Sequence, residues 1–159
     1  MKIDMHCHVS GSGTRLDQVD QDVYFNPADN NHWFTRILYK LIESNLASMG
    51  GDPGGDGTIS TDDYLGLIYT LLATSEELDG LVLLALDALY SPETGALDER
   101  RTDLWVSNRF LANTVDELNR RLQAEPDAAR RAKRFFFAAS VSPNRPDWRD
   151  ELDFVVGET

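Results

Sequence analysis

Three short stretches of the chain have the pattern of strands, at residues 2–9, 80–87 and 135–141. In the second and third stretches the apolar residues are consecutive, which is typical of strands covered on both faces in a parallel sheet. The first stretch ends at Ser10-Gly11-Ser12-Gly13, a run that favours a loop. We therefore predict three strands over these ranges.

Apolar residues at helical spacing occupy the segments between these strands. One helix is predicted over 34–49, and another after Ser60, which resembles an N-cap with Asp63 three residues on. A third helical stretch is predicted over 104–123, with a restart at Thr114, where a capping box begins.

A last helix is predicted after the third strand. Pro146 suits a first helical turn, and Trp148, Leu152 and Val155 would line the buried side of the helix. The order strand, helices, strand, helices, strand, helix predicts an α/β protein with right-handed crossovers.

The length of 159 residues suffices for one hydrophobic core. We therefore expect residues 1–159 to form a single domain, in which residues 10–78 are a long helical insertion between the first and second strands.

Composition narrows the choice of partners and compartment. The formal net charge of −12 opposes binding to phosphate backbones and anionic membranes, so neither nucleic acid nor a membrane is an expected partner. Cys7 is the only cysteine, which excludes an intrachain disulfide and fits a reducing compartment. The chain starts without a charged-then-apolar leader, and its longest apolar run, 81–86, is too short to cross a bilayer. A cytoplasmic location is expected.

The sequence His6-Cys7-His8 carries the clearest chemical signal. Side chains alternate along a strand, so both imidazoles should project from one face and Cys7 from the other. Two imidazoles at the carboxyl end of a parallel strand are suited to hold one ion of the Zn²⁺ class. The competing explanation is a chance pair of core histidines, each with its own hydrogen bond.

The segment Ile3–His8 resembles the first strand of the amidohydrolase superfamily, which carries an Asp-x-His-x-His-type motif. The segments 77–87 (ELDGLVLLALD) and 139–152 (ASVSPNRPDWRDEL) are similar to the amidohydrolase-2 branch, which contains decarboxylases and lactone or amide hydrolases. The His-x-His element also occurs in TatD-type nucleases and in polymerase-and-histidinol-phosphatase-type phosphoesterases.

The resemblance implies a (β/α)8 barrel with one or two divalent ions that activate water or polarise a substrate carbonyl or carboxylate. His6 and His8 would be ligands, with zinc as the first choice and manganese or iron as alternatives; the other ligands of the family lie on later strands. A full barrel needs about 250 residues, so this chain is expected to be the N-terminal portion of one. Such a fragment should be inactive and bind metal weakly. Its unpaired sheet edge and uncovered face should make it a homo-oligomer.

Three residues at strand ends are candidates for contact with a small-molecule substrate: Asp87, Ser142 and Arg145. Strand ends are where substrates bind in barrels, and an arginine can hold a carboxylate through two hydrogen bonds. Structural roles are the alternative, with Asp87 capping a neighbouring backbone and Arg145 paired with Asp147 or Asp150.

A signal of a different class lies between the two helices predicted first. Residues 52–63 partly match a calcium-binding loop, with Asp52, Asp56 and Asp63 at ligand positions. Gly54 stands where a ligand is usual, and an ordinary interhelical loop explains the segment equally well.

Taken together, these features favour a metal-dependent hydrolase, or a non-oxidative decarboxylase, acting on a small organic substrate through metal-activated water. The alternatives are a metal-dependent phosphoesterase or TatD-like nuclease, and a non-enzymatic calcium-binding or structural module that uses the 52–63 loop.

Overall fold

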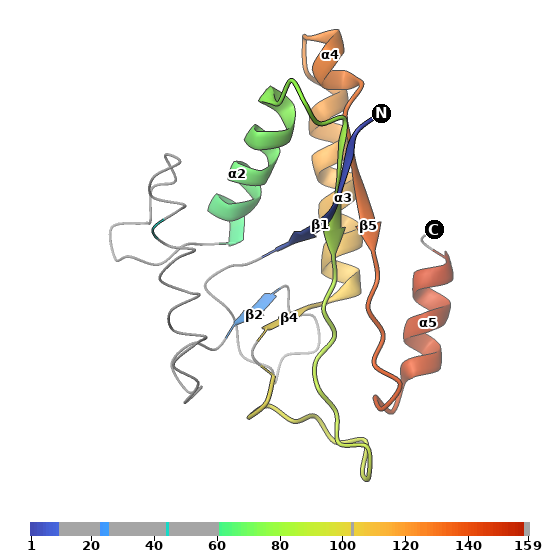
Figure 1. Ribbon diagram of the computed structural model, residues 1–159. Coiled ribbons are helices and arrows are strands. Elements are labelled where there is room, and N and C mark those ends of the chain that lie inside the picture. The colour runs from blue at the N-terminus through green and yellow to red at the C-terminus, as the bar shows by residue number, and fades with distance from the viewer. Residues whose placement is uncertain (10–22, 26–43, 45–60, 103, 158–159) are drawn as a thin grey trace.

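The computed structural model describes residues 1–9, 23–25, 44, 61–102 and 104–157. It is an α/β arrangement around a parallel three-stranded sheet in the order β1-β3-β5 (Figure 1). These strands are β1 (Ile3–His8), β3 (Gly80–Leu84) and β5 (Arg134–Ala138). They confirm the three predicted strands, with β3 and β5 ending about three residues earlier than their apolar runs. In the described residues the sheet is open rather than a closed barrel.

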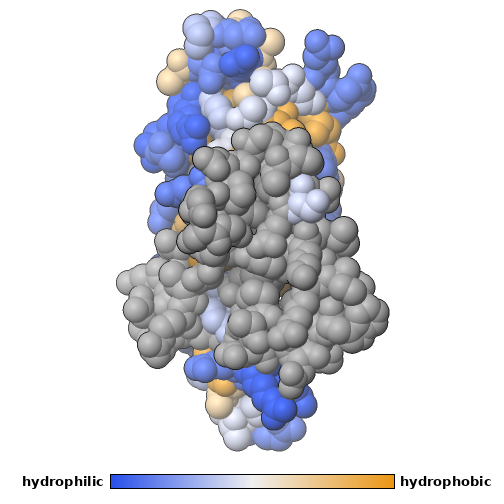
Figure 2. All heavy atoms as spheres, turned by 90° about the vertical axis from the view of Figure 1, so that its left-hand side faces the viewer, coloured by the Kyte–Doolittle hydropathy of each residue, from blue (hydrophilic) through white to orange (hydrophobic). Residues whose placement is uncertain are grey.

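The remaining described elements connect or cover this sheet. A short antiparallel pair joins β2 (Val23–Phe25) to β4 (Leu104–Val106). The helices are α2 (Thr61–Thr74), α3 (Asn108–Gln123), α4 (Ala128–Arg131) and α5 (Trp148–Gly157). No helix in the described part of the chain is long and apolar enough to cross a membrane. The described surface that Figure 2 shows is mainly hydrophilic, as expected for a chain with a net charge of −12.

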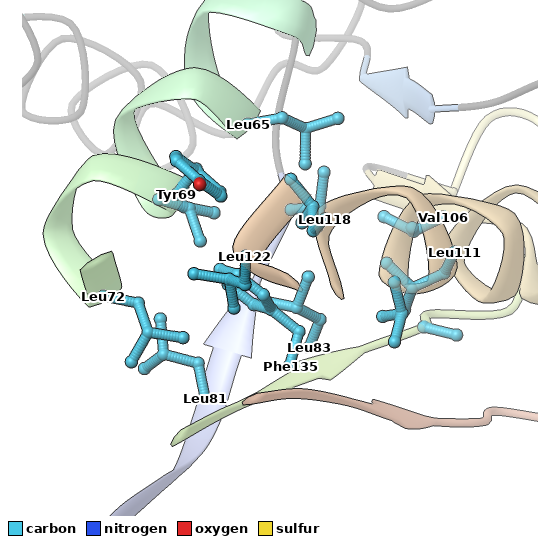
Figure 3. Packing of buried hydrophobic residues seen from close by; sticks show 14 of the residues in the cluster. Leu65, Tyr69, Leu72, Leu81, Leu83, Val106, Leu111, Leu118, Leu122 and Phe135 are labelled. Atoms are coloured by element: carbon cyan, nitrogen blue, oxygen red, sulfur yellow. The ribbon is translucent and has the colours of Figure 1, made fainter. Parts of the chain in front are cut away.

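The hydrophobic core lies between one face of the sheet and the helices α2 and α3 (Figure 3). The sheet contributes Leu83 and Phe135, and the helices contribute residues such as Leu72 and Leu122, all at most 2% exposed. We call this side the helix-covered face; its residues are Cys7, Leu81, Leu83, Phe135 and Phe137.

The opposite side of the sheet carries the alternating partners of these residues. We call it the open face; by register it contains His8, Val82, Leu84, Phe136 and Ala138. Val82, on the central strand, is buried, whereas Phe136, on an edge strand, is 36% exposed. The same three strands therefore have one packed face and one face that is accessible at its edges.

The register of β1 against β3 shifts between Asp4 and Cys7. Asp4 pairs with Leu81 and Cys7 with Leu83, so two residues of β1 oppose the single residue Val82, as in a β-bulge. The Asp4 carboxylate is exposed and accepts a hydrogen bond from the His6 backbone N–H at 3.0 Å. The bulge breaks the strict alternation that would have placed Asp4 on the same side as the two histidines.

The prediction of one helical stretch over 104–123 was wrong at its start. Leu104–Val106 forms β4, whose backbone pairs with β2, and Val106 also bridges to Leu86. Helix α3 begins only after Ser107, whose side chain caps the helix by accepting a hydrogen bond from the Phe110 N–H. The predicted restart at Thr114 is also wrong, because α3 continues through that residue.

The buried stripe predicted for the last helix was wrong at two of its three residues, because only Val155 is half-buried. Pro146 precedes α5 by two residues, and Trp148 and Leu152 are 38% and 42% exposed. Glu151 is the buried residue of α5. Its carboxylate can be buried because Asn108, at the start of α3, donates a hydrogen bond to it at 2.7 Å.

Candidate metal centre

His6 and His8 lie together at the carboxyl end of β1. Their Nε2 atoms are 2.9 Å apart, and the rings meet edge to face, with centroids 4.6 Å apart. Both residues are exposed. The alternation along the strand thus places the two imidazoles on the same side, as predicted. Without an ion, the same contact is a hydrogen bond between the two Nε2 atoms, and the ring tautomers decide which of them donates.

This spacing can be compared with what an ion requires. Imidazole nitrogens bind Zn²⁺ at about 2.0–2.1 Å, so two of them lie about 3.3 Å apart in a tetrahedral site and about 2.9 Å apart at a right angle. The observed separation fits adjacent ligands of a six-coordinate ion as it stands. It fits zinc after the nitrogens separate by about 0.4 Å. The pair therefore suits a divalent ion of the predicted class.

The protonation state of the pair also suits a metal ligand. Partial desolvation of its ring lowers the pKa of His8, and the nearby His6 lowers it further. Because only the neutral ring has a free nitrogen lone pair, a lowered pKa keeps His8 in the ligand form near neutral pH. The backbone of His8 is held from the opposite side of the strand, since the Tyr64 hydroxyl donates to its carbonyl at 3.1 Å.

The neighbouring residues of β1 do not extend the pair into a larger ligand set. Cys7 packs against the hydrophobic core, and burial, with a smaller effect of the Asp4 charge, raises the pKa of its thiol to about 11. The protonated thiol is a poor metal ligand. Within the described ranges, no three groups among His, Cys, Asp and Glu side chains are placed to hold one ion.

The strand-end candidates Asp87, Ser142 and Arg145 form a second polar group. Arg145 Nη1 lies 3.3 Å from both carboxylate oxygens of Asp87, and the Ser142 backbone N–H donates to Asp87 Oδ2 at 2.7 Å. The Asp87 and Arg145 side chains are only 3% and 12% exposed. The structure therefore brings these three residues together, after β3 and β5.

Arg145 is already fully engaged by protein carboxylates. Its Nε and Nη2 donate to the two oxygens of Asp147 at 2.8 and 3.0 Å, and Nη2 also lies 3.5 Å from Glu151. Burial alone would lower the pKa of Arg145, but the hydrogen bonds to Asp147 and the charges of Asp87 and Glu151 raise it. The guanidinium thus holds loops together, and a substrate carboxylate would have to displace one of these partners.

Two residues of this polar group were not predicted from the sequence. Asn108 is buried, donates to Glu151, and exchanges two hydrogen bonds with the Ser140 backbone at 2.9 and 3.0 Å. Both Asn108 and Glu151 lie on predicted helices, and neither was singled out as a candidate site residue. Their role depends on contacts between segments 32 and 43 residues apart, which local pattern does not reveal.

A cavity of about 870 Å³ adjoins this polar group. Asp87, Asn108, Arg145 and Glu151 line it, together with one side of α3. Its lining residues do not include His6 or His8, and α3 packs on the helix-covered face of the sheet. The cavity and the imidazole pair are therefore separate features, and no hydrogen bond or ion pair between described residues links the two polar groups.

The predicted calcium loop lies almost wholly outside the described residues. This applies to Asp52 and Asp56, whereas Asp63 stands in the first turn of α2. Negative side chains are favoured in that position by the helix dipole alone. The predicted helix over 34–49 also lies outside the described residues, apart from position 44.

No protein-family model, curated protein or solved structure matches this chain. The resemblance to amidohydrolases therefore remains a prediction made from the motifs of the chain itself.

Proposed function

We propose that this chain is part of a metal-dependent hydrolase, or non-oxidative decarboxylase, that acts on small organic substrates. The observation that carries the proposal is the pair of Nε2 atoms 2.9 Å apart at the carboxyl end of a parallel strand. In open and closed parallel α/β folds, this end of the sheet is where active sites form.

The layout of the sheet supports the proposal that this site belongs to a (β/α)8 barrel. The three strands are parallel and lie in the order in which they occur in the chain, and α2 and α3 pack on one face only. Successive strands of a (β/α)8 barrel have the same order, with helices outside and the other face turned to the interior. The open face, which carries His8, would then be the inner wall of the barrel.

His6 and His8 would hold the ion, with zinc as the first choice and manganese or iron as alternatives. A bound ion of this class lowers the pKa of coordinated water to about 7 and so supplies a nucleophile at neutral pH. The contribution of the described residues is to position the ligands: Tyr64 holds the His8 carbonyl, and Asp4 holds the His6 amide. A phosphoesterase using the same pair is disfavoured, because a net charge of −12 repels phosphate substrates.

The proposal is tested by titrating the metal-free chain with Co²⁺ and following its visible absorption, with zinc as a competitor. Wild type should bind the ion through nitrogen ligands and show the weak bands of five- or six-fold coordination, which leaves positions for water. His6→Ala and His8→Ala should lose the signal. Cys7→Ala is the matched control, because its thiol faces the core.

Two results would overturn the proposal. One is a wild-type chain that binds no divalent ion; the other is a His6→Ala variant that binds it as well as wild type. Because both histidines are exposed, their replacement should leave the fold intact, which far-ultraviolet circular dichroism verifies.

A further inference from the structure

Tyr64, near the start of α2, reaches the end of β1 from the helix-covered side of the sheet. Its hydroxyl donates to the His8 carbonyl at 3.1 Å, and its ring packs against the hydrophobic core. The helix itself is anchored in that core by Leu65, Ile68 and Leu72, which are 9% exposed or less; Figure 3 shows the first and last of these. The hydroxyl therefore connects a packed helix to the backbone of a proposed metal ligand.

The Tyr64 hydroxyl is the stronger of two side-chain donors to this carbonyl. The other is the Cys7 thiol, whose Sγ lies 3.9 Å from the oxygen. A thiol is a weak donor, whereas a tyrosine hydroxyl is a full one. Loss of the hydroxyl would therefore leave the His8 carbonyl with only a weak side-chain contact.

The two proposed ligands are held in different ways. The His6 N–H donates to Asp4, which belongs to the same strand and moves with it. The partner of His8 is 56 residues away, on a different element. The bond from Asp4 fixes the local shape of β1, whereas the bond from Tyr64 fixes the strand end relative to α2.

The end of the strand needs such a contact more than its middle does. His8 is the last residue of β1, so the regular strand backbone does not continue beyond it. An ion that binds both imidazoles has to order this residue, and the cost of ordering weakens binding. A hydrogen bond that holds the backbone in advance moves this cost from metal binding to folding. Residues that do not touch a metal commonly set its affinity by orienting the ligands.

We infer that Tyr64 is a positioning residue of the metal site, through which the affinity for the ion depends on the attachment of α2 to β1. The inference rests on the proposed function and adds a residue from outside the set of ligands. Coupling of this kind is reciprocal, so a bound ion also stabilises the contact between α2 and β1. Removal of the hydroxyl should weaken metal binding about fivefold, the equivalent of one neutral hydrogen bond.

Titration of metal-free Tyr64→Phe with Co²⁺, followed by visible absorption, tests the inference. The dissociation constant should rise about fivefold over that of wild type. The absorption at saturation should stay the same, because the ligands are unchanged.

Tyr69→Phe is the matched control. It lies on the same helix and loses a hydroxyl that donates to Glu125 at 2.7 Å, away from the histidines. This variant should be less stable than wild type but bind Co²⁺ with the same affinity. Both variants keep the aromatic ring, so the fold should persist, which far-ultraviolet circular dichroism verifies.

Hydrogen exchange of the α2 amides gives a second measurement, which does not depend on the absorption of the ion. Added Zn²⁺ should slow their exchange in wild type and in Tyr69→Phe, since the bound ion strengthens the attachment of the helix. In Tyr64→Phe saturated with Zn²⁺, exchange of these amides should be the same with and without the ion.

The other outcomes separate this inference from the proposed function. If Tyr64→Phe binds Co²⁺ as tightly as wild type, Tyr64 has no positioning role, and the metal-dependent hydrolase still stands. An equal loss of affinity in Tyr69→Phe would also overturn the inference, because the loss would then follow from the stability of α2. So would a changed absorption at saturation, which would mean a different set of ligands. A wild-type chain that binds no ion would overturn both proposals.

Discussion

The two faces of the three-stranded sheet are built from the same strands but differ in how far their side chains are buried. On the helix-covered face, Leu83 and Phe135 are at most 2% exposed and pack against α2 and α3 (Figure 3). On the open face, His8 is exposed and Phe136 is 36% exposed. Neighbours in sequence therefore belong to different environments: Cys7 packs into the core, while His6 and His8, on either side of it, do not.

Because of this difference, the residues that stabilise the fold and the residues proposed to bind metal lie on different faces of the sheet. Burial of apolar area on one face supplies most of the stabilising free energy, because hydrophobic burial dominates folding. The other face leaves the imidazole of His8 accessible, so that it can bind an ion without loss of core packing. Substitutions on the helix-covered face should change unfolding, and substitutions at the histidines should change metal binding.

The adjacent pair Phe135 and Phe136 gives the largest expected contrast between the faces. Phe135→Ala leaves a cavity in the core and should lower the free energy of unfolding by about 4 kcal/mol. Phe136→Ala removes a side chain that is 36% exposed and should cost about 1 kcal/mol or less. Urea denaturation followed by circular dichroism measures both values. Equal losses would mean that Phe136 is as buried in solution as Phe135, which would contradict the difference in burial between the two faces.

The loops after β3 and β5 give the next largest effect. Arg145→Met leaves the Asp87 carboxylate, only 3% exposed, without its cationic partner. Removing one member of a buried ion pair costs about 3 kcal/mol. Arg149→Met is the matched control, because Arg149 is exposed and stacks on Trp148 at the surface.

A double variant identifies the cause of that loss. If the cost of Arg145→Met comes from the stranded charge, then adding Asp87→Asn should recover part of it. Losses that simply add would show that Arg145 acts through packing instead. In either case metal binding at His6 and His8 should not change, because no described contact joins the two groups.

The parts of this fold that could be predicted from sequence are those with a local signal. The consecutive apolar residues of 80–87 and 135–141 predicted two parallel strands, and both are present. The alternation in β1 correctly predicted His6 and His8 on one side and Cys7 on the other.

The parts that could not be predicted depend on contacts distant in sequence. Leu104–Val106 has apolar residues that fit a helix as well as a strand, and its pairing with Val23–Phe25 decides the outcome. Glu151 was not among the residues predicted to be buried, yet it is buried because Asn108, 43 residues away, donates to it. Arg145 likewise pairs with Asp87, 58 residues away, and so joins two loops. Such a structural role was the alternative to substrate binding.

The smallest expected effect lies on the helix-covered side, where Tyr69 of α2 donates a hydrogen bond to Glu125 at 2.7 Å. This hydrogen bond, and the nearby Arg130, lower the pKa of Glu125. A carboxyl whose pKa is lower in the folded than in the unfolded state stabilises the fold above its unfolded pKa of about 4.3. That contribution is lost as the pH falls through the lower folded value.

Tyr69→Phe tests this pH dependence. It also sharpens the contrast with the open face, because it should change stability and leave metal binding at the histidines unchanged. At pH 7 the variant should be less stable than wild type, because the carboxylate loses its hydroxyl donor. The loss should be smaller than that of Phe135→Ala or of Arg145→Met. The gap should narrow as the pH is lowered from 5 towards 3, since the protonated Glu125 is a weaker acceptor. Urea denaturation at several pH values measures the gap. A gap that stays constant across this range would show that the hydroxyl contributes through packing, and that the charge of Glu125 has no part in joining α2 to the end of α3.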